Sequence, residues 1–325
     1  VDVFASGIGG DSRIVVSGGK LHLSSLRVVP LCIASSTWPS IRPKLEALRG
    51  SRSKWVPSYM DLDSVPQTTE FYTFNRRFNG ERLGPEQEKV LELVAQEPRS
   101  LYELAELLNI HPLSLNLRRM EALGMVLRIG LTPTDMLHAE GSYVEYDAEA
   151  SRLAVEIQAA NAEMEAADLV TTAKRMVIEK IATEVFKKLI YEEAGEGKMC
   201  DIANSLVGNM IRGVGRRDFA VNIRLNKPII GIGAPVGAYL PGVADIFHTD
   251  LMLPRDSGIG NAAGAVSGNV MDEVVERGLL EVLPLTHIRG RSLHDAFVIV
   301  DEAQSLERNV LLTVLSRMGQ NSKVV

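Results

Sequence analysis

The sequence predicts an α/β protein that carries a small helical module. Two observations support this fold class: apolar runs enter glycine-rich turns near both ends of residues 1–237, and helical periodicity fills much of the chain between them. A third is the run Ala296–Val300, which is apolar throughout and is followed by Asp301 and Glu302, as expected of a buried strand ending at a sheet edge.

The composition is that of an ordinary globular protein. The chain has 325 residues, of which 46% are hydrophobic and 23% charged, and its net charge is −6. This length predicts two or three domains, and the acidic balance argues against a protein that coats nucleic acid or anionic lipid. We see no signal peptide, and glycines and prolines interrupt the apolar run at 228–243, so we expect a cytoplasmic protein without a membrane segment.

Residues 1–82 are predicted to be rich in strands. Arg13–Val16 and Lys20–Leu23 flank the Gly18-Gly19 pair, which is typical of a β-hairpin. Residues 35–82 contain many Ser, Pro and Arg residues and are interpreted as connecting strands and loops.

Residues 83–146 are predicted to form a winged-helix-like module. Pro85 and a Ser100/Glu103 capping box begin two helices, Pro112 begins a third that ends at Gly124, and a strand follows at 125–129. DNA binding is the alternative reading, but acidic residues interrupt the basic ones, so we favour a module for packing or subunit contact.

Residues 147–267 are predicted to be helical and then α/β. Apolar residues recur every three to four positions over 147–193, which indicates the longest helical stretch. Strands are expected near 227–231 and 250–254, with a short helix between them.

Two glycine-rich turns are candidate phosphate or nucleoside sites, because glycine lets backbone N–H groups approach an anion closely. The first is Gly7–Ser12, in which Asp11 can hold a metal or a water molecule; a plain hairpin turn is the alternative. The second is Gly231–Pro235, for which tight packing between strand and helix is the alternative.

Asp135 and His138 form a candidate metal pair. Their spacing of three places both side chains on one face of a helix beginning near Pro133. A carboxylate and an imidazole suit Zn²⁺ or Mn²⁺. The alternative is that a threonine caps this helix and His138 is a hydrogen-bonded polar residue.

The order of these motifs resembles the hydantoinase/5-oxoprolinase A-subunit family over residues 1–267. The motifs are Gly7–Ser12, Arg27–Leu31, Gly130–His138, Lys227–Pro235 and Asn261–Ala265. The resemblance implies half of an actin-like, sugar-kinase-like ATPase fold and ATP-dependent hydrolysis of a cyclic amide. Ketone carboxylase subunits are relatives, and a ketone substrate and a second, B-type subunit are therefore also implied.

This resemblance also implies roles for individual residues. Asp11 would be catalytic, and Asp135 and His138 would bind metal. The nucleotide-binding positions would be Gly7, Gly9, Gly10, Ser12, Gly231, Gly233, Ala234 and Pro235. The family's first phosphate loop does not occur in these residues, so the expected nucleotide site is incomplete.

Residues 268–325 predict a different enzyme, a partial P-loop α/β fragment. Asp301 would hold Mg²⁺ and Glu302 would orient the attacking water, as the carboxylates after the Walker B strand of an ATPase do. The segment Leu283–Gln304 resembles the PhoH-like ATPase family, which implies a nucleotide hydrolase linked to RNA metabolism. No G-x-x-x-x-G-K-[ST] motif occurs in the 325 residues.

Two incomplete enzymes are thus expected to meet near residues 265–271. We interpret the junction as a chimeric reading frame, with a truncated record of an unusual fusion as the alternative. The hydantoinase-type function is the main prediction because that resemblance covers more of the chain, and the PhoH-like ATPase is the alternative.

Overall fold

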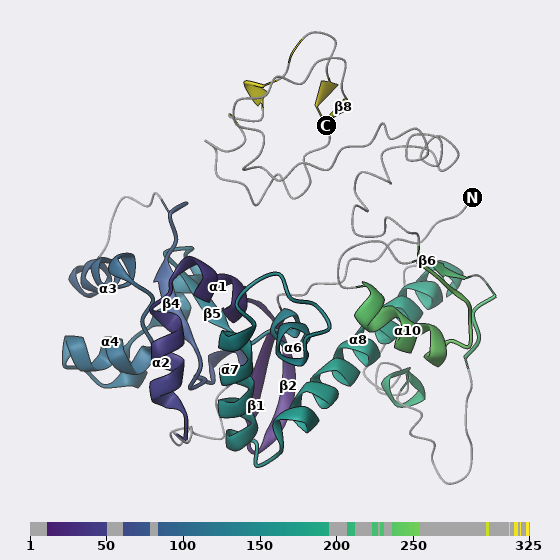
Figure 1. Ribbon diagram of the computed structural model, residues 1–325, viewed down its shortest axis with the longest axis horizontal. Coiled ribbons are helices and arrows are strands. Elements are labelled where there is room, and N and C mark those ends of the chain that lie inside the picture. The colour runs from purple at the N-terminus through teal and green to yellow at the C-terminus, as the bar shows by residue number, and fades with distance from the viewer. Residues whose placement is uncertain are drawn as a thin grey trace. The chain divides into compact units, whose positions relative to one another are not determined.

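The computed structural model is a mixed α/β protein of helices and small, separate sheets (Figure 1). The chain divides into an N-terminal unit, Val1–Pro228 with Ala238–Asp250, and a C-terminal unit, Ile229–Gly237 with Leu251–Val325. The structure describes residues 12–50, 61–78, 84–194, 207–211, 223–226, 228–230, 236–253, 297–298, 312, 315–317, 319 and 323–324. Its sheets have two or three strands in this part of the chain, and the actin-like fold is not shown.

The predicted hairpin opens the N-terminal unit. Strands β1 (Ser12–Ser17) and β2 (Lys20–Arg27) pair antiparallel, with Ser17 opposite Lys20. The two turn residues have positive φ angles, 56° at Gly18 and 69° at Gly19. A two-residue turn of this kind needs that backbone region at both positions, which is why glycines connect these strands.

A three-stranded sheet of order β3-β5-β4 follows. Strand β5 (Val126–Gly130) lies in the centre, parallel to β3 (Val29–Pro30) and antiparallel to β4 (Phe71–Phe74). Four of the five β5 residues are buried, as expected for a central strand.

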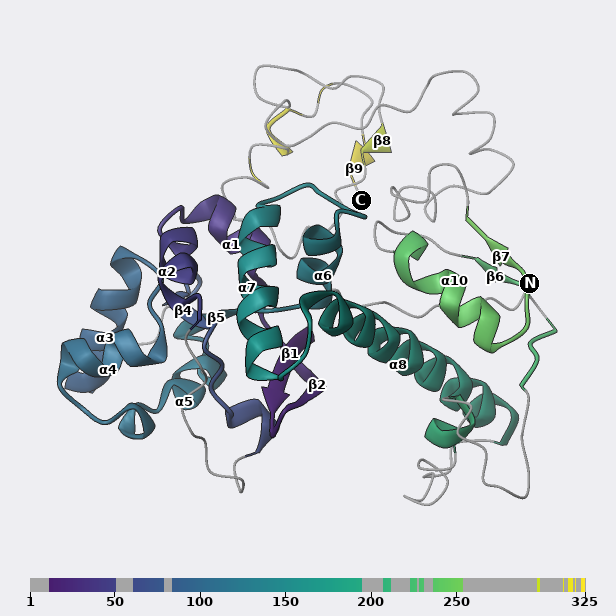
Figure 2. The same cartoon turned by 60° about the horizontal axis from the view of Figure 1, so that its bottom comes forward.

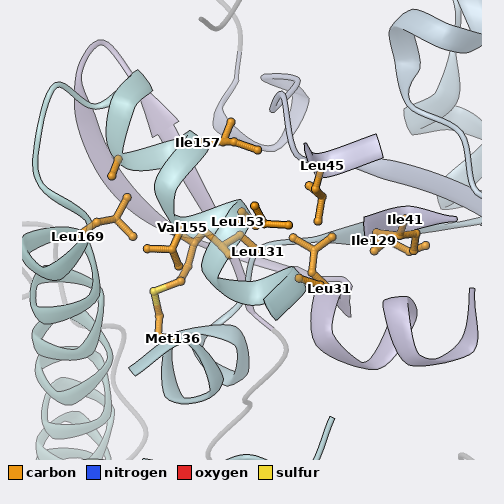
Figure 3. Close-up of a cluster of buried hydrophobic side chains, with 14 of the residues drawn as sticks. Leu31, Ile41, Leu45, Ile129, Leu131, Met136, Leu153, Val155, Ile157 and Leu169 are labelled. Carbon is orange, nitrogen blue, oxygen red and sulfur yellow. The ribbon is translucent and has the colours of Figure 1, made fainter. Parts of the chain in front are cut away.

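Five helices pack with this sheet and the hairpin around one core: α1 (Leu31–Thr37), α2 (Ile41–Leu48), α6 (Pro133–Glu140), α7 (Ala148–Asn161) and the first turns of α8 (Ala166–Ala194). Figure 3 shows side chains from these elements converging, among them Leu31, Leu45 and Leu153. The prediction of strands and loops over residues 35–82 was therefore wrong for α2 and the end of α1. Both helices are shorter than nine residues, too short for periodicity to reveal.

The long helical stretch is divided into two helices. Helix α7 ends at Asn161, and α8 (Ala166–Ala194) begins after a turn in which Glu163 adopts a left-handed conformation with φ 53°. The apolar period continues across this turn, and for this reason the sequence alone indicated one stretch.

The helical module has a core of its own. It contains α3 (Pro85–Gln96), α4 (Leu101–Leu108), a 3₁₀ turn η2 (Pro112–Ser114) and α5 (Leu117–Ala122), and it ends in β5. Pro85 and the Ser100/Glu103 capping box begin the first two helices as predicted. The third predicted helix is broken, because Leu115 is extended and Asn116 starts a separate helix by accepting a hydrogen bond from Arg119 N.

A buried ion-pair network fastens the hairpin to the sheet. Arg13 of β1 is fully buried and pairs with Glu70, just before β4, while its Nη1 donates to the carbonyl of Leu62 at 2.9 Å. Arg128 of β5 lies 3.8 Å from the same carboxylate and 2.8 Å from Glu121 of α5. Nothing in the local sequence pattern marked these charges as buried.

The C-terminal unit contains two parallel strand pairs. Strand β6 (Ile229–Ile230) pairs with β7 (Leu251–Met252), and β8 (Phe297–Val298) pairs with β9 (Lys323–Val324). Among the residues that the structure describes, no helix is long and apolar enough to cross a membrane.

Candidate functional site

The β8–β9 pair provides the frame of the candidate site. Its register places Phe297 opposite Lys323 and Val298 opposite Val324. Because the strands are parallel, their carboxyl ends lie at the same edge, where open α/β sheets bind ligands. Asp301 and Glu302 come three and four residues after Val298 along the chain. Both lie outside the described residues, so their placement rests on the strand and the sequence.

The two carboxylates that follow β8 in the sequence are of a type that suits Mg²⁺. Carboxylate oxygens are ligands of the type that this cation takes in proteins, usually one or two of them beside water and phosphate oxygens. No histidine or cysteine lies between Val298 and Ser305, so oxygen is the ligand atom that the side chains of this segment offer.

Most of the two glycine-rich turns falls outside the described residues, including Asp11 and all of Gly231–Pro235. Of the first turn, the structure describes Ser12, which is the first residue of β1 and lies opposite Arg27. The second turn follows Ile230, the last residue of β6. The nucleotide-binding roles of these turns stay predictions.

Asp135 serves as a buried cap for two helices. In α6 it completes a capping box with Thr132, whose N–H donates to Oδ2 at 2.9 Å. The same carboxylate accepts from Leu31 N at 3.2 Å and Cys32 N at 2.8 Å, the first N–H groups of α1, which has no side-chain cap of its own. Ser151 Oγ of α7 donates a further bond of 2.8 Å.

His138 is buried and uses both ring nitrogens within the protein. Nδ1 lies 2.9 Å from the carbonyl of Thr134, which makes it the donor. Nε2 then accepts from the N–H groups of Glu145 at 3.3 Å and Tyr146 at 3.2 Å. The ring also stacks on Tyr146 and meets Tyr143 edge-on.

These contacts do not support the binding of Zn²⁺ or Mn²⁺ by Asp135 and His138. Protein donors already occupy both side chains, although Asp135 and His138 do share one short helix as predicted. Within the described ranges, no group of three or more His, Cys, Asp and Glu residues could hold a metal ion. The alternative that Thr132 caps the helix is confirmed, since its hydroxyl accepts from Asp135 N.

Cys32 is also a structural residue. It is fully buried beside Asp135, and burial, with that carboxylate adding to it, raises the pKa of the thiol far above its usual range. A thiol kept protonated in this way is a poor nucleophile or metal ligand. Cys32 is therefore a buried structural thiol, whereas Cys200 lies outside the described residues.

One shallow cavity was not anticipated from the sequence. It measures about 270 Å³ in the N-terminal unit, and polar side chains dominate its lining. Its residues are Arg224, Leu225, Asn226, Pro228, His248, Thr249 and Asp250. Neither of the two lining stretches, 224–228 and 248–250, contains a glycine-rich turn or a carboxylate pair, so the sequence offered no signal for this cavity.

The comparisons with known proteins found similarity in the C-terminal region. Residues 168–325 match the family described as PhoH-like protein. The matched range contains the β8–β9 pair with Asp301 and Glu302, and it also includes the junction expected near residue 268. No solved structure matches the chain.

Similar curated proteins carry the same family name. The protein PhoH2 of Thermobispora bispora is 60% identical over 100 residues, and that of Mycolicibacterium smegmatis is 57% identical over 100 residues. Each match covers 30% of this chain and 22% of the relative. A PhoH-like protein of Bacillus subtilis is 33% identical over 103 residues, which are 32% of this chain and 31% of that protein. The chain thus spans about a fifth of the length of the PhoH2 relatives.

These findings overturn the main functional prediction. The family match and the relatives are PhoH-like, and nothing in them supports a hydantoinase or oxoprolinase region. The prediction failed because it gave more weight to the length of a resemblance built on short glycine-containing motifs than to the continuous resemblance at Leu283–Gln304.

Proposed function

We propose that the C-terminal region of this chain is part of a PhoH-like P-loop ATPase. Its contribution would be the strand and the two carboxylates that act on Mg²⁺-nucleotide. The observation that carries the proposal is the parallel β8–β9 pair, with Asp301 and Glu302 three and four residues after the end of β8 in the sequence. The family match over residues 168–325 supports it independently.

The two carboxylates would have different tasks. Asp301, the first beyond the strand, would fix the water shell of Mg²⁺, and Glu302 would orient and deprotonate the water that attacks the terminal phosphate. When bound, Mg²⁺ neutralises charge on the β- and γ-phosphate oxygens.

The family resemblance also suggests the setting of this activity. It implies a nucleotide hydrolase linked to RNA metabolism, a role that we propose only for the protein to which this region belongs. The cradle for the phosphates would be a Walker A loop, which does not occur in the 325 residues.

The proposal is tested by nucleotide binding that depends on Mg²⁺. A fluorescent ATP analogue is titrated into the purified chain with Mg²⁺ and with EDTA. We expect Mg²⁺ to lower the Kd of the analogue. Asp301→Asn should raise the Kd measured with Mg²⁺ about tenfold, which is equivalent to one lost charge-assisted contact. Glu302→Gln should leave binding unchanged, because its task concerns water rather than nucleotide.

Asp295→Asn is the matched control. It removes one negative charge shortly before the same strand, at the end away from the site. Equal loss of the Mg²⁺ effect in Asp295→Asn and Asp301→Asn, or no Mg²⁺ effect in the unaltered chain, would contradict the proposal.

A further inference from the structure

The shallow cavity of the N-terminal unit is formed by two stretches of chain that a backbone hydrogen bond joins. One wall comes from the stretch 224–228 and the other from 248–250, and every lining residue belongs to this unit. Leu225 N donates to the carbonyl of Phe247, just before the second stretch, over 3.0 Å. The backbone therefore holds the two walls of the cavity together.

Helix α10 (Val236–Ile246) anchors the second wall. It lies beside α8 in both views (Figures 1 and 2), and the ring of Phe247, directly after α10, is 6.5 Å from that of Phe186 on α8. Phe247 is fully buried, and Thr249 N donates to the carbonyl of Ala244 at 3.1 Å. These contacts fix the turn that forms the second wall.

Opposite charges line this cavity without pairing with each other. Arg224 and Asp250 both contribute to its wall and both are exposed, yet neither forms an ion pair with any residue in the described part of the chain. By contrast, two exposed charges on α7, Arg152 and Glu149, lie 2.9 Å apart. The charges of the cavity are therefore available to a ligand that carries both signs.

A small zwitterion has the chemistry that these walls would recognise. An α-amino acid carries a carboxylate and an ammonium group on one carbon atom. A guanidinium group binds a carboxylate through two parallel hydrogen bonds, and an aspartate accepts hydrogen bonds from an ammonium group. The volume of about 270 Å³ lies below the range of about 300–1,000 Å³ that is usual for larger ligands, so it suits a molecule of this size.

We propose that this cavity binds a free α-amino acid, with Arg224 holding its carboxylate and Asp250 its ammonium group. Polar side chains dominate the lining, among them Asn226 and His248, so the cavity selects an amino acid with a short polar side chain. Asp301 and Glu302 belong to the C-terminal unit, so this site is separate from the proposed nucleotide site and does not rest on the proposed function.

The test follows the binding of L-serine to the purified chain by saturation-transfer NMR. We expect a saturable signal with a Kd of about 1 mM, because exposed charge contacts contribute little in water. Arg224→Gln and Asp250→Asn should each raise this Kd about fivefold, since each removes one charge-assisted contact. Acetate and methylamine, which each carry one of the two charges, should bind at least about fivefold more weakly than serine.

The matched controls are Arg175→Gln and Asp245→Asn, which remove exposed charges from α8 and α10 outside the lining. They should leave the Kd of serine unchanged. Both tested side chains are exposed, so thermal unfolding should show the same Tm for all variants. The absence of saturable serine binding, or equal effects in the tested and control variants, would overturn the proposal. Acetate binding as tightly as serine would overturn it as well, because the site would then recognise only an anion.

Discussion

At the scale of the residue, Asp135 shows how one side chain can look like a ligand and act as a cap. Its carboxylate sits at the N-termini of α1 and α6, where unpaired N–H groups and the helix dipole both favour an anion. The sequence could reveal half of this, the Thr132 capping box. It could not reveal the bonds to Leu31 and Cys32, which are more than a hundred positions away.

Asp135→Ala should therefore lower the free energy of unfolding by about 3 kcal/mol, because several buried donors lose their acceptor. Chemical denaturation measures this loss. Asp168→Ala is the control, since it removes an exposed carboxylate from the first turn of α8 and should cost less than about 1 kcal/mol. A loss for Asp135→Ala no larger than that of the control would refute the double-cap role.

Asp147 makes the stability of the fold depend on pH. Burial by itself would raise its pKa, but hydrogen bonds from Ser35 Oγ and Arg42 outweigh burial and lower it. A lowered folded-state pKa means that the carboxylate stabilises the fold above the unfolded value of about 3.9, and that this stability is lost as pH falls through the folded value.

Asp147 is also the N-cap of α7, so Asp147→Ala should cost about 1 kcal/mol at pH 7. The difference from the unaltered chain should shrink in denaturation curves taken below about pH 4. A difference that stays constant, or grows, toward acid pH would show that the ionised carboxylate is not what stabilises the helix.

At the scale of the element, sequence patterns located the helices that carry their own start signals. Pro85 and the Ser100/Glu103 pair act through neighbouring residues, so the sequence contains all the information that they need. Helices α1 and α2 lack such signals; α1 starts after Pro30 without a side-chain cap and depends on Asp135 from α6. Elements stabilised by distant partners are the ones that sequence reasoning missed.

The N-cap of α4 allows the contribution of a local start signal to be measured. Ser100→Ala removes the acceptor for Glu103 N, 3.2 Å away, and should lower stability by about 1 kcal/mol. Ser100→Asp restores an acceptor of the right length and should lose less than half as much. Thermal unfolding of the two variants checks the prediction, which fails if Asp is no better than Ala at this position.

At the scale of the whole molecule, the α/β class was predictable, whereas the main prediction of function was wrong and the comparisons favour its PhoH-like alternative. Strand–turn–helix patterns follow from local periodicity, and β6, α10 and β7 lie where they were expected. Which enzyme those patterns belong to depends on longer stretches of sequence. The PhoH-like stretch combines the apolar strand β8 with two carboxylates shortly after it in the sequence, which is the pattern of a Walker B strand.

The 325-residue chain itself should release little phosphate from Mg²⁺-ATP. Phosphoryl transfer needs a backbone cradle and a lysine around the β- and γ-phosphates, and no Walker A motif occurs in this sequence. We expect turnover well below about 1 s⁻¹, the low end of ordinary enzymes. Turnover at that rate, abolished by Asp301→Asn, would reveal a phosphate cradle formed by other residues.

The most direct test of the central claim is to locate the cation along the chain. Fe²⁺ can replace Mg²⁺ in the presence of ATP, and with ascorbate and peroxide it cleaves the backbone next to its binding site. We expect fragments, identified by mass spectrometry, that end close to Asp301 and disappear in Asp301→Asn but persist in Asp295→Asn. Cleavage beside Asp135 and His138, unaffected by Asp301→Asn, would contradict it.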